Sequence, residues 1–198
     1  MVVYLVRHGQ TTSDIEDRYG GDYEDHLTDE GIAQVTKAAE KLKDKGIQMI
    51  FVSSRVRAQE SAKIISEKTG AKIEIEPDLR ERNQYGILTG MVKAEARQKY
   101  PKEAEEAGNP LNTIKGAEDF ENFKKRVISV FEKITKKKDL TTIAIVTHGG
   151  PIRRIFSKIK NLPDNTDISL QDCATIKIET DEQGKRILET EGVVVSSK

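Results

Sequence analysis

Two of the three histidines in this chain of 198 residues stand in the same local setting, after a short apolar run and before a glycine. His8 lies in Arg7-His8-Gly9, and His148 lies in Thr147-His148-Gly149. A neutral imidazole is a competent nucleophile and proton carrier. A neighbouring glycine lets a ligand approach the backbone and accept a hydrogen bond from its N–H. The repeated setting indicates one reactive site that contains both histidines.

Arginines and a glutamate follow two further strand-like runs. Arg55 and Arg57 come directly after Met49–Val52, and Glu81 comes shortly after Lys72–Glu76. A guanidinium matches the oxygens of a phosphate in a bidentate way. Phosphoryl transfer needs mainly positioning and stabilisation of charge on those oxygens, and a carboxyl group can give its proton to the leaving alcohol. These residue types together predict phosphoryl transfer through a phosphohistidine.

The elements that must bring these side chains together are alternating strands and helices. Further runs predict a strand at Thr142–Val146 and helices at Asp29–Lys45, Arg55–Lys68, from Glu118 onward and at Pro151–Lys160. Repeated strand–helix units predict an α/β fold, a three-layer α/β/α sandwich with a mostly parallel sheet. Ligands of such sheets bind beyond the carboxyl ends of the strands, where the histidines lie. Ala174–Glu179 and Gly192–Val195 are expected to be edge strands.

Composition narrows the class of protein. Length predicts a single domain, 1–198, with an irregular excursion at about 86–116. Lys plus Arg and Asp plus Glu both number 33, which argues against a dedicated nucleic-acid binder. The one cysteine, Cys173, fits a reducing cytosol, and no apolar run approaches the ~18 residues of a membrane span. We therefore expect a soluble cytoplasmic protein without nucleic-acid or membrane partners.

Several motifs in the chain resemble those of a known family. Leu5–Thr11 reads LVRHGQT, Ser53–Ala62 reads SSRVRAQESA, and Val146–Arg153 reads VTHGGPIR. Shorter matches complete the pattern in the correct order: Arg18–Gly21 with Leu27–Gln34, Leu79–Glu81, and Gly116–Glu118 with Arg126. This pattern resembles the histidine phosphatase superfamily, also called the phosphoglycerate mutase-like family, over nearly the whole chain.

The resemblance implies a phosphoglycerate mutase-like fold and a role for each matching residue. His8 would be the nucleophile that becomes phosphorylated, and Glu81 would protonate the leaving group and then activate water. The phosphate pocket would contain Arg7, Arg57, His148 and the backbone N–H of Gly149. No metal and no organic cofactor is implied, and the partner would be a small phosphorylated metabolite.

The sequence departs from the family pattern at several positions. Asp14 stands where the family commonly has asparagine, and a carboxylate there would repel phosphate unless it were protonated or paired, for example with Arg18. Asp14 and Arg18 are both candidate substrate-binding residues. One residue more than usual separates Glu81 from Gly86, which affects where the carboxylate lies. Asp119 replaces a family serine as a helix N-cap.

Alternatives remain within and beyond the family. Mutase members have a longer segment before the second histidine, and this extra chain keeps water away from the intermediate. The interval from Glu81 to His148 is short here, which favours a phosphatase. A phosphoglycerate mutase, primed by 2,3-bisphosphoglycerate, is the alternative. A non-catalytic phospho-ligand binding module is disfavoured because His8 and Glu81 are both present. A metal hydrolase is disfavoured because fixed arginines oppose a cation.

The excursion at 86–116 is expected to contact the leaving group. Its cationic side chains suggest further anionic groups on the substrate: Lys93, Arg97, Lys99 and Lys115. Nothing in the sequence specifies an oligomeric state. His26 is expected to be exposed, and Cys173 is expected to be a small core residue.

Overall fold

The computed structural model describes residues 1–180 and 186–196 and contains a six-stranded sheet in the order β3-β2-β4-β1-β5-β6. The first four strands in this order are parallel, and β5 and β6 are antiparallel additions beside β1. The strands are β1 Val2–Arg7, β2 Met49–Val52, β3 Lys72–Ile75, β4 Thr142–Thr147, β5 Ile168–Thr180 and β6 Arg186–Val195. The prediction of a mostly parallel α/β sheet is confirmed.

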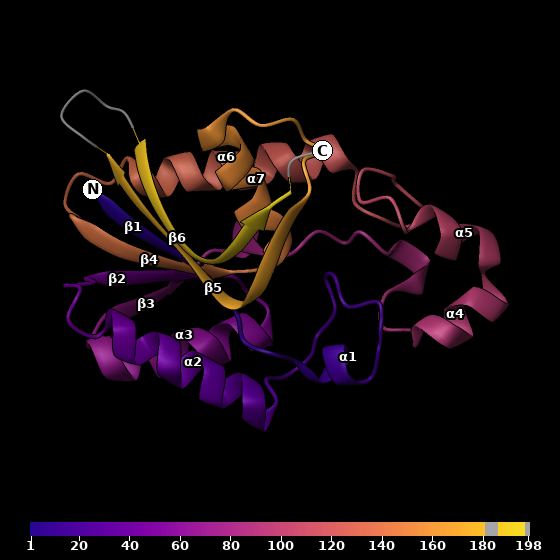
Figure 1. Ribbon diagram of the computed structural model, residues 1–198, viewed down its shortest axis with the longest axis horizontal. Helices are drawn as coiled ribbons and strands as arrows, with labels where there is room; N and C mark the ends of the chain where they lie inside the picture. The colour runs from indigo at the N-terminus through magenta and orange to yellow at the C-terminus, as the bar shows by residue number, and fades with distance from the viewer. Residues whose placement is uncertain (181–185, 197–198) are drawn as a thin grey trace.

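Two pairs of helices cover the two faces of the sheet (Figure 1). The helices α2 (Asp29–Leu42) and α3 (Val56–Thr69) cover one face, and α6 (Phe120–Thr135) and α7 (Gly149–Lys160) cover the other. Because both faces are covered, β1 and β4 are buried almost throughout, as their continuous apolar runs predict. The predicted N-cap Asp119 is confirmed, since its Oδ1 accepts a hydrogen bond from Asn122 N. Thr28 caps α2 in the same way, because its Oγ1 accepts from Gly31 N.

A crevice opens where the chain leaves the two central strands in opposite directions. The chain passes from β1 toward α2 on one face and from β4 into α7 on the other. Parallel sheets bind ligands at such a switch point. His8 and His148 directly follow these two strands, so the topology brings both imidazoles to the same crevice.

The excursion at 86–116 forms a lobe beyond the carboxyl ends of the parallel strands, at the right of Figure 1. It contains the 3₁₀ turn η2 (Gly86–Leu88) and two short helices, α4 (Lys93–Lys99) and α5 (Pro101–Glu106). The two helices are separate because Pro101 lacks the N–H needed to continue α4 and instead begins α5. The small core of the lobe comprises Tyr19, Leu88, Ala96, Ala107 and Ile114.

Arg82 attaches this lobe to the rest of the protein. It is 3% exposed, and its guanidinium donates to three backbone carbonyl oxygens, those of Glu118, Pro110 and Asn112. Arg82 follows Glu81 directly, so the same turn positions the carboxylate and the lobe. The remaining short elements are α1 (Thr12–Ile15) and the 3₁₀ turn η1 (Pro77–Leu79).

The expectation that Ala174–Glu179 is an edge strand is wrong. These residues belong to β5, which lies between β1 and β6, and its side chains alternate between buried and exposed. The edge is formed by β6, which contains the expected Gly192–Val195 strand. Cys173 is half-buried, with φ of 57°, at an irregularity in the β5–β6 pairing. Within the described residues, no helix is long and apolar enough to span a membrane.

Candidate active site

His8 lies at the carboxyl end of β1 and is only 6% exposed. Its Nδ1 lies 2.8 Å from the carbonyl oxygen of Gly9, so Nδ1 carries the proton and donates it, and Nε2 keeps its lone pair. The turn after His8 packs tightly against the start of α2, because a Cβ on Gly9 would lie 2.5 Å from the carbonyl oxygen of Gly31. The backbone thereby fixes both the tautomer and the position of the ring.

Arg57, in the first turn of α3, contacts the free nitrogen of His8. Its Nε donates to His8 Nε2 at 3.2 Å. Its terminal nitrogens donate to Asp25 Oδ1 at 2.7 Å and to the backbone oxygens of Tyr23 and Gly21. Four of its five N–H groups therefore have partners within the protein. A phosphate at His8 would meet a guanidinium whose orientation is already fixed.

His148 follows β4, fully buried, with its ring centroid 5.1 Å from that of His8. Its Nε2 lies 2.7 Å from the hydroxyl oxygen of Ser53, which also accepts a hydrogen bond from Arg55 N. Because Ser53 already accepts from the backbone, its own proton is available to His148 Nε2. This arrangement favours the tautomer in which Nδ1 carries the proton and can donate to a ligand.

Both imidazoles are held neutral. Burial, followed by the charges of Arg57 and Arg7, holds the pKa of His8 well below its ordinary value of 6.5. Burial, followed by the charge of Arg57, lowers the pKa of His148 in the same way. At neutral pH, His8 is therefore unprotonated at Nε2 and suited to act as a nucleophile.

Two buried nitrogen atoms beside His8 lack partners among the described residues. These atoms are Arg7 Nε and His148 Nδ1. The terminal nitrogens of Arg7 are engaged with the carbonyl oxygen of Leu170 at 2.6 Å and with Asp172 Oδ1 at 3.2 Å. A buried donor without an acceptor costs about 1–3 kcal/mol, which a bound anion would recover. The unsatisfied donors therefore point to an anion-binding site.

Glu81 lies on the other side of the crevice, held by two backbone N–H groups. Its Oε2 accepts from Gly150 N at 2.9 Å, and its Oε1 accepts from Arg82 N at 2.9 Å. A Cβ on Gly150 would lie only 2.1 Å from Oε1, so this helical turn leaves room for the carboxylate only because it is glycine. The extra residue before Gly86 does not move Glu81 out of the site.

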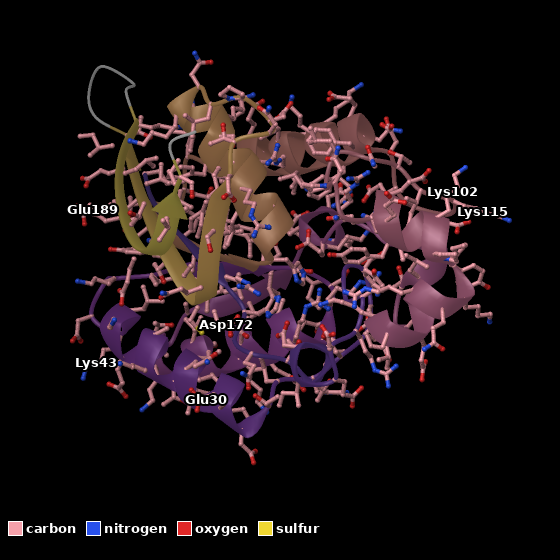
Figure 2. All side chains as sticks on the ribbon, turned by 45° about the vertical axis from the view of Figure 1, so that its right-hand side comes forward. Glu30, Lys43, Lys102, Lys115, Asp172 and Glu189 are labelled. Atoms are coloured by element: carbon pink, nitrogen blue, oxygen red, sulfur yellow. The ribbon has the colours of Figure 1, made fainter. Side chains whose placement is uncertain are left out.

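A cavity of about 840 Å³ joins these groups to the lobe. The sequence-predicted residues that line it are Arg7, His8, Asp14, Arg18, Arg57, Glu81, Lys93, Arg97 and Gly149. His148 lies behind this surface, and Lys99 and Lys115 do not line the cavity. Figure 2 shows Lys115 at the outer margin of the lobe, directed away from the protein.

The pairing of Asp14 with Arg18 that the sequence suggested is not found. Asp14 Oδ2 instead accepts from the backbone N and the hydroxyl of Thr11, at 2.9 and 2.8 Å, and caps α1. Arg18 donates to Glu16 and to the carbonyl oxygen of Gly90 at 2.7 Å. Hydrogen bonding within its own turn satisfies Asp14, and the Arg18 guanidinium has other partners.

Three residues of this site were not predicted individually from the sequence. Ser53 could have been found as a polar residue at the end of a buried strand, since it belongs to the matched segment. Asp25 and Asp172 gave no such signal, because each meets its arginine only after the chain folds. His26 is exposed, as predicted, and pairs with Glu60. Within the described ranges, no group of three or more His, Cys, Asp or Glu side chains is arranged to hold a metal ion.

Comparison with known proteins places the chain in a family. The model of the histidine phosphatase superfamily (branch 1) matches residues 3–191. The chain belongs to this superfamily. A metal-independent phosphoserine phosphatase from Arabidopsis thaliana is 34% identical over 163 residues, covering 79% of this chain and 68% of the relative. A 2,3-bisphosphoglycerate-dependent phosphoglycerate mutase from Parvibaculum lavamentivorans is 28% identical and covers 92% of both chains.

The fold agrees with that of solved members of the superfamily. The crystal structure of a putative alpha-ribazole-5'-P phosphatase from Escherichia coli superposes with a TM-score of 0.87, at 20% identity, and covers 97% of this chain and 96% of its own. The crystal structure of a phosphoglycerate mutase from Bacillus anthracis superposes with a TM-score of 0.75, at 24% identity, and covers 97% of this chain and 92% of its own, which confirms the phosphoglycerate mutase-like fold. The relatives include both phosphatases and mutases, so they support an enzyme of one of these two kinds.

Proposed function

We propose that the protein hydrolyses a small phosphate monoester through a phosphohistidine on His8. The observation that carries this proposal is the state of His8 Nε2, which is buried, unprotonated and held against the guanidinium of Arg57. A neutral Nε2 beside a fixed guanidinium suits attack on a phosphoryl group, because Arg57 can transfer its hydrogen bond from Nε2 to a phosphoryl oxygen and so free the lone pair.

In the first step, His8 Nε2 attacks phosphorus and the bond to the leaving oxygen breaks. Arg57, Arg7 Nε and His148 Nδ1 donate hydrogen bonds to the phosphoryl oxygens. Glu81 gives its proton to the leaving oxygen, so the alcohol departs neutral. The products of this step are the alcohol, a phosphohistidine and an ionised Glu81.

In the second step, water replaces the alcohol. The Glu81 carboxylate accepts a proton from this water as the water attacks phosphorus, and the bond to His8 Nε2 breaks. Inorganic phosphate leaves, and the neutral imidazole is restored. Fixed guanidinium charge stabilises the transferring group throughout, so we expect activity to persist in the presence of a chelator, without added cofactor.

Hydrolysis is favoured over mutase chemistry by the lobe above the cavity. It consists of two short helices, α4 and α5, and a mutase must enclose its intermediate to keep water out. The phosphoserine phosphatase relative supports the same conclusion. The alternative is a phosphoglycerate mutase, which the 28% identical relative supports. Conversion of 3-phosphoglycerate to its isomer, measured with and without 2,3-bisphosphoglycerate, distinguishes the two activities.

The leaving group is proposed to lie beneath the 86–116 lobe, where Lys93 and Arg97 line the cavity. Lys93 pairs with Asp17 at 2.5 Å, whereas Arg97 is exposed at the margin of the cavity. A screen of phosphorylated metabolites, with and without a second anionic group, would define the substrate class. The cytoplasmic location expected from the sequence remains part of this proposal.

Substitution of the nucleophile tests the proposal. His8→Ala should abolish turnover of p-nitrophenyl phosphate, because no group remains to accept the phosphoryl group. His26→Ala is the matched control, since His26 is exposed and pairs with Glu60 outside the cavity. The His26→Ala control should keep wild-type turnover. Near wild-type turnover by His8→Ala as well would contradict the phosphohistidine mechanism.

A further inference from the structure

Asp25 forms a buried ion pair with the arginine that contacts His8. The side chains of Arg57 and Asp25 are 4% and 2% exposed, and Arg57 donates to Asp25 Oδ1 at 2.7 Å. The second carboxylate oxygen accepts a hydrogen bond from the hydroxyl of Ser13. Asp25 also lines the cavity, so its charge faces the space in which phosphate would bind.

The neighbouring loop contains a second, similar pair outside the cavity. Asp22 accepts from Arg55 Nε at 2.5 Å, and neither residue lines the cavity. The loop therefore supplies two similar ion pairs. Asp25–Arg57 lies inside the candidate site, and Asp22–Arg55 lies outside it. The outer pair serves as an internal control for the effect of an Asp–Arg contact on the fold.

The two arginines beside His8 each have a carboxylate partner. Arg7 is paired with Asp172, as Arg57 is with Asp25, and Asp14 lines the same cavity. Asp172 belongs to β5, the strand beside β1. A buried carboxylate near a bound phosphate repels it across a medium of low polarity, where charge is weakly screened. The arginines would therefore hold phosphate less tightly than two unpaired guanidinium groups would.

We infer that Asp25 is a positioning residue and counter-ion for Arg57, which orients the guanidinium toward His8 and weakens the binding of product phosphate. The inference rests on the proposed function, because it assumes that Arg57 contacts the phosphoryl group. Orientation follows from the hydrogen bond to Arg57, and the weakened affinity follows from the negative charge. The two effects can be separated by substitution.

Asp25→Asn separates them, because an amide keeps the shape and the hydrogen bonds but removes the charge. Its Oδ1 can accept from Arg57, and its NH₂ group can donate to the hydroxyl oxygen of Ser13. Inorganic phosphate should inhibit this variant about tenfold more strongly than wild type, with lower KM and lower kcat for p-nitrophenyl phosphate. Damage to the fold would weaken phosphate binding, so tighter binding is not a structural artefact.

The experiment measures the inhibition constant of inorganic phosphate for wild type, Asp25→Asn and Asp22→Asn, with thermal unfolding as a check on folding. The inference predicts tighter inhibition in Asp25→Asn and no more than about a twofold change in Asp22→Asn. If Asp25→Asn does not fold, Asp25→Ser tests the charge alone: inorganic phosphate should again inhibit more strongly, while kcat also falls because Arg57 loses its orienting contact.

The outcomes distinguish the inference from the function on which it rests. Unchanged or weaker phosphate inhibition in folded Asp25→Asn, with normal inhibition of wild type, would overturn the role of Asp25 alone. Equal tightening in both variants would also overturn it, because the effect would then not depend on the cavity. Absence of phosphate inhibition in wild type, together with full activity of His8→Ala, would overturn the proposed function and this inference with it.

Discussion

Gly150 is the position at which a single methyl group should disable the proton donor without weakening the fold. A Cβ there would lie 2.1 Å from Glu81 Oε1 and 3.0 Å from its Cδ, whereas ordinary contact begins near 3.4 Å. The carboxylate must therefore move by more than about 1 Å, and a misplacement of ~1 Å at a reacting group can reduce the rate about 100-fold. The same Cβ would lie 3.2 Å from Phe123 Cζ, and the ~1 kcal/mol by which helices favour alanine over glycine offsets that tight contact, so thermal stability should stay close to that of wild type.

The assay compares two kinds of substrate in Gly150→Ala. Hydrolysis of an alkyl phosphate, whose leaving oxygen needs a proton, should fall about 100-fold, and hydrolysis of p-nitrophenyl phosphate should fall much less. In a Glu81→Gln background, Gly150→Ala should add little further loss, because the donor is already absent. Additive losses in the double variant, or equal losses on both substrates, would refute the assignment of Glu81 as the proton donor.

Further predictions follow from the arginines and the histidines. Arg57→Lys keeps the charge but loses the planar fork that contacts His8, Asp25 and two carbonyl groups. Its kcat/KM should fall about 100- to 1,000-fold, which corresponds to the ~2.7–4 kcal/mol of transition-state stabilisation lost with one preorganised donor. Arg55→Lys, outside the cavity, should have a mild effect; similar losses in steady-state kinetics would contradict the placement of Arg57. Because burial lowers the pKa of His8 and His148 below 6.5, the unfolded chain binds more protons than the folded protein below that pH. Stability should therefore fall as pH decreases below 6.5, by up to ~1.4 kcal/mol per pH unit for each histidine, and His8→Asn should show a shallower fall in denaturant titrations. An unchanged slope in His8→Asn would show that His8 is not held neutral.

The sequence predicts the parallel half of the fold well, because that half depends on local patterns. Continuous apolar runs mark β1 and β4 as buried strands, and the position of His8 and His148 after these strands follows from the chain itself. Parallel topology then brings them together. The antiparallel half is predicted less well, since an alternating strand such as β5 has the same pattern inside the sheet as at its edge.

The partners of the charged residues are the part of the site that sequence patterns do not reveal. Asp25 and Asp172 lie far along the chain from the arginines they contact, and their pairing depends on how the loops after β1 and within β5 fold back. Asp14 illustrates the opposite case, because it bonds within its own turn although a nearby arginine was available by charge alone. The partner of Asp14 is therefore determined by hydrogen bonds within its own turn and not by the charge of Arg18.

The most direct test of the account is to trap the intermediate. A radiolabelled phosphate monoester, quenched rapidly under alkaline conditions and digested, should leave acid-labile label on the peptide that contains His8 in wild type and none in His8→Ala. Glu81→Gln should accumulate more of this label from p-nitrophenyl phosphate, because the water that removes it lacks its base. Nucleophilic catalysis by His8 would be contradicted if wild type and Glu81→Gln turned over substrate without label on the His8 peptide. Label on a peptide that contains His148 instead would contradict it too.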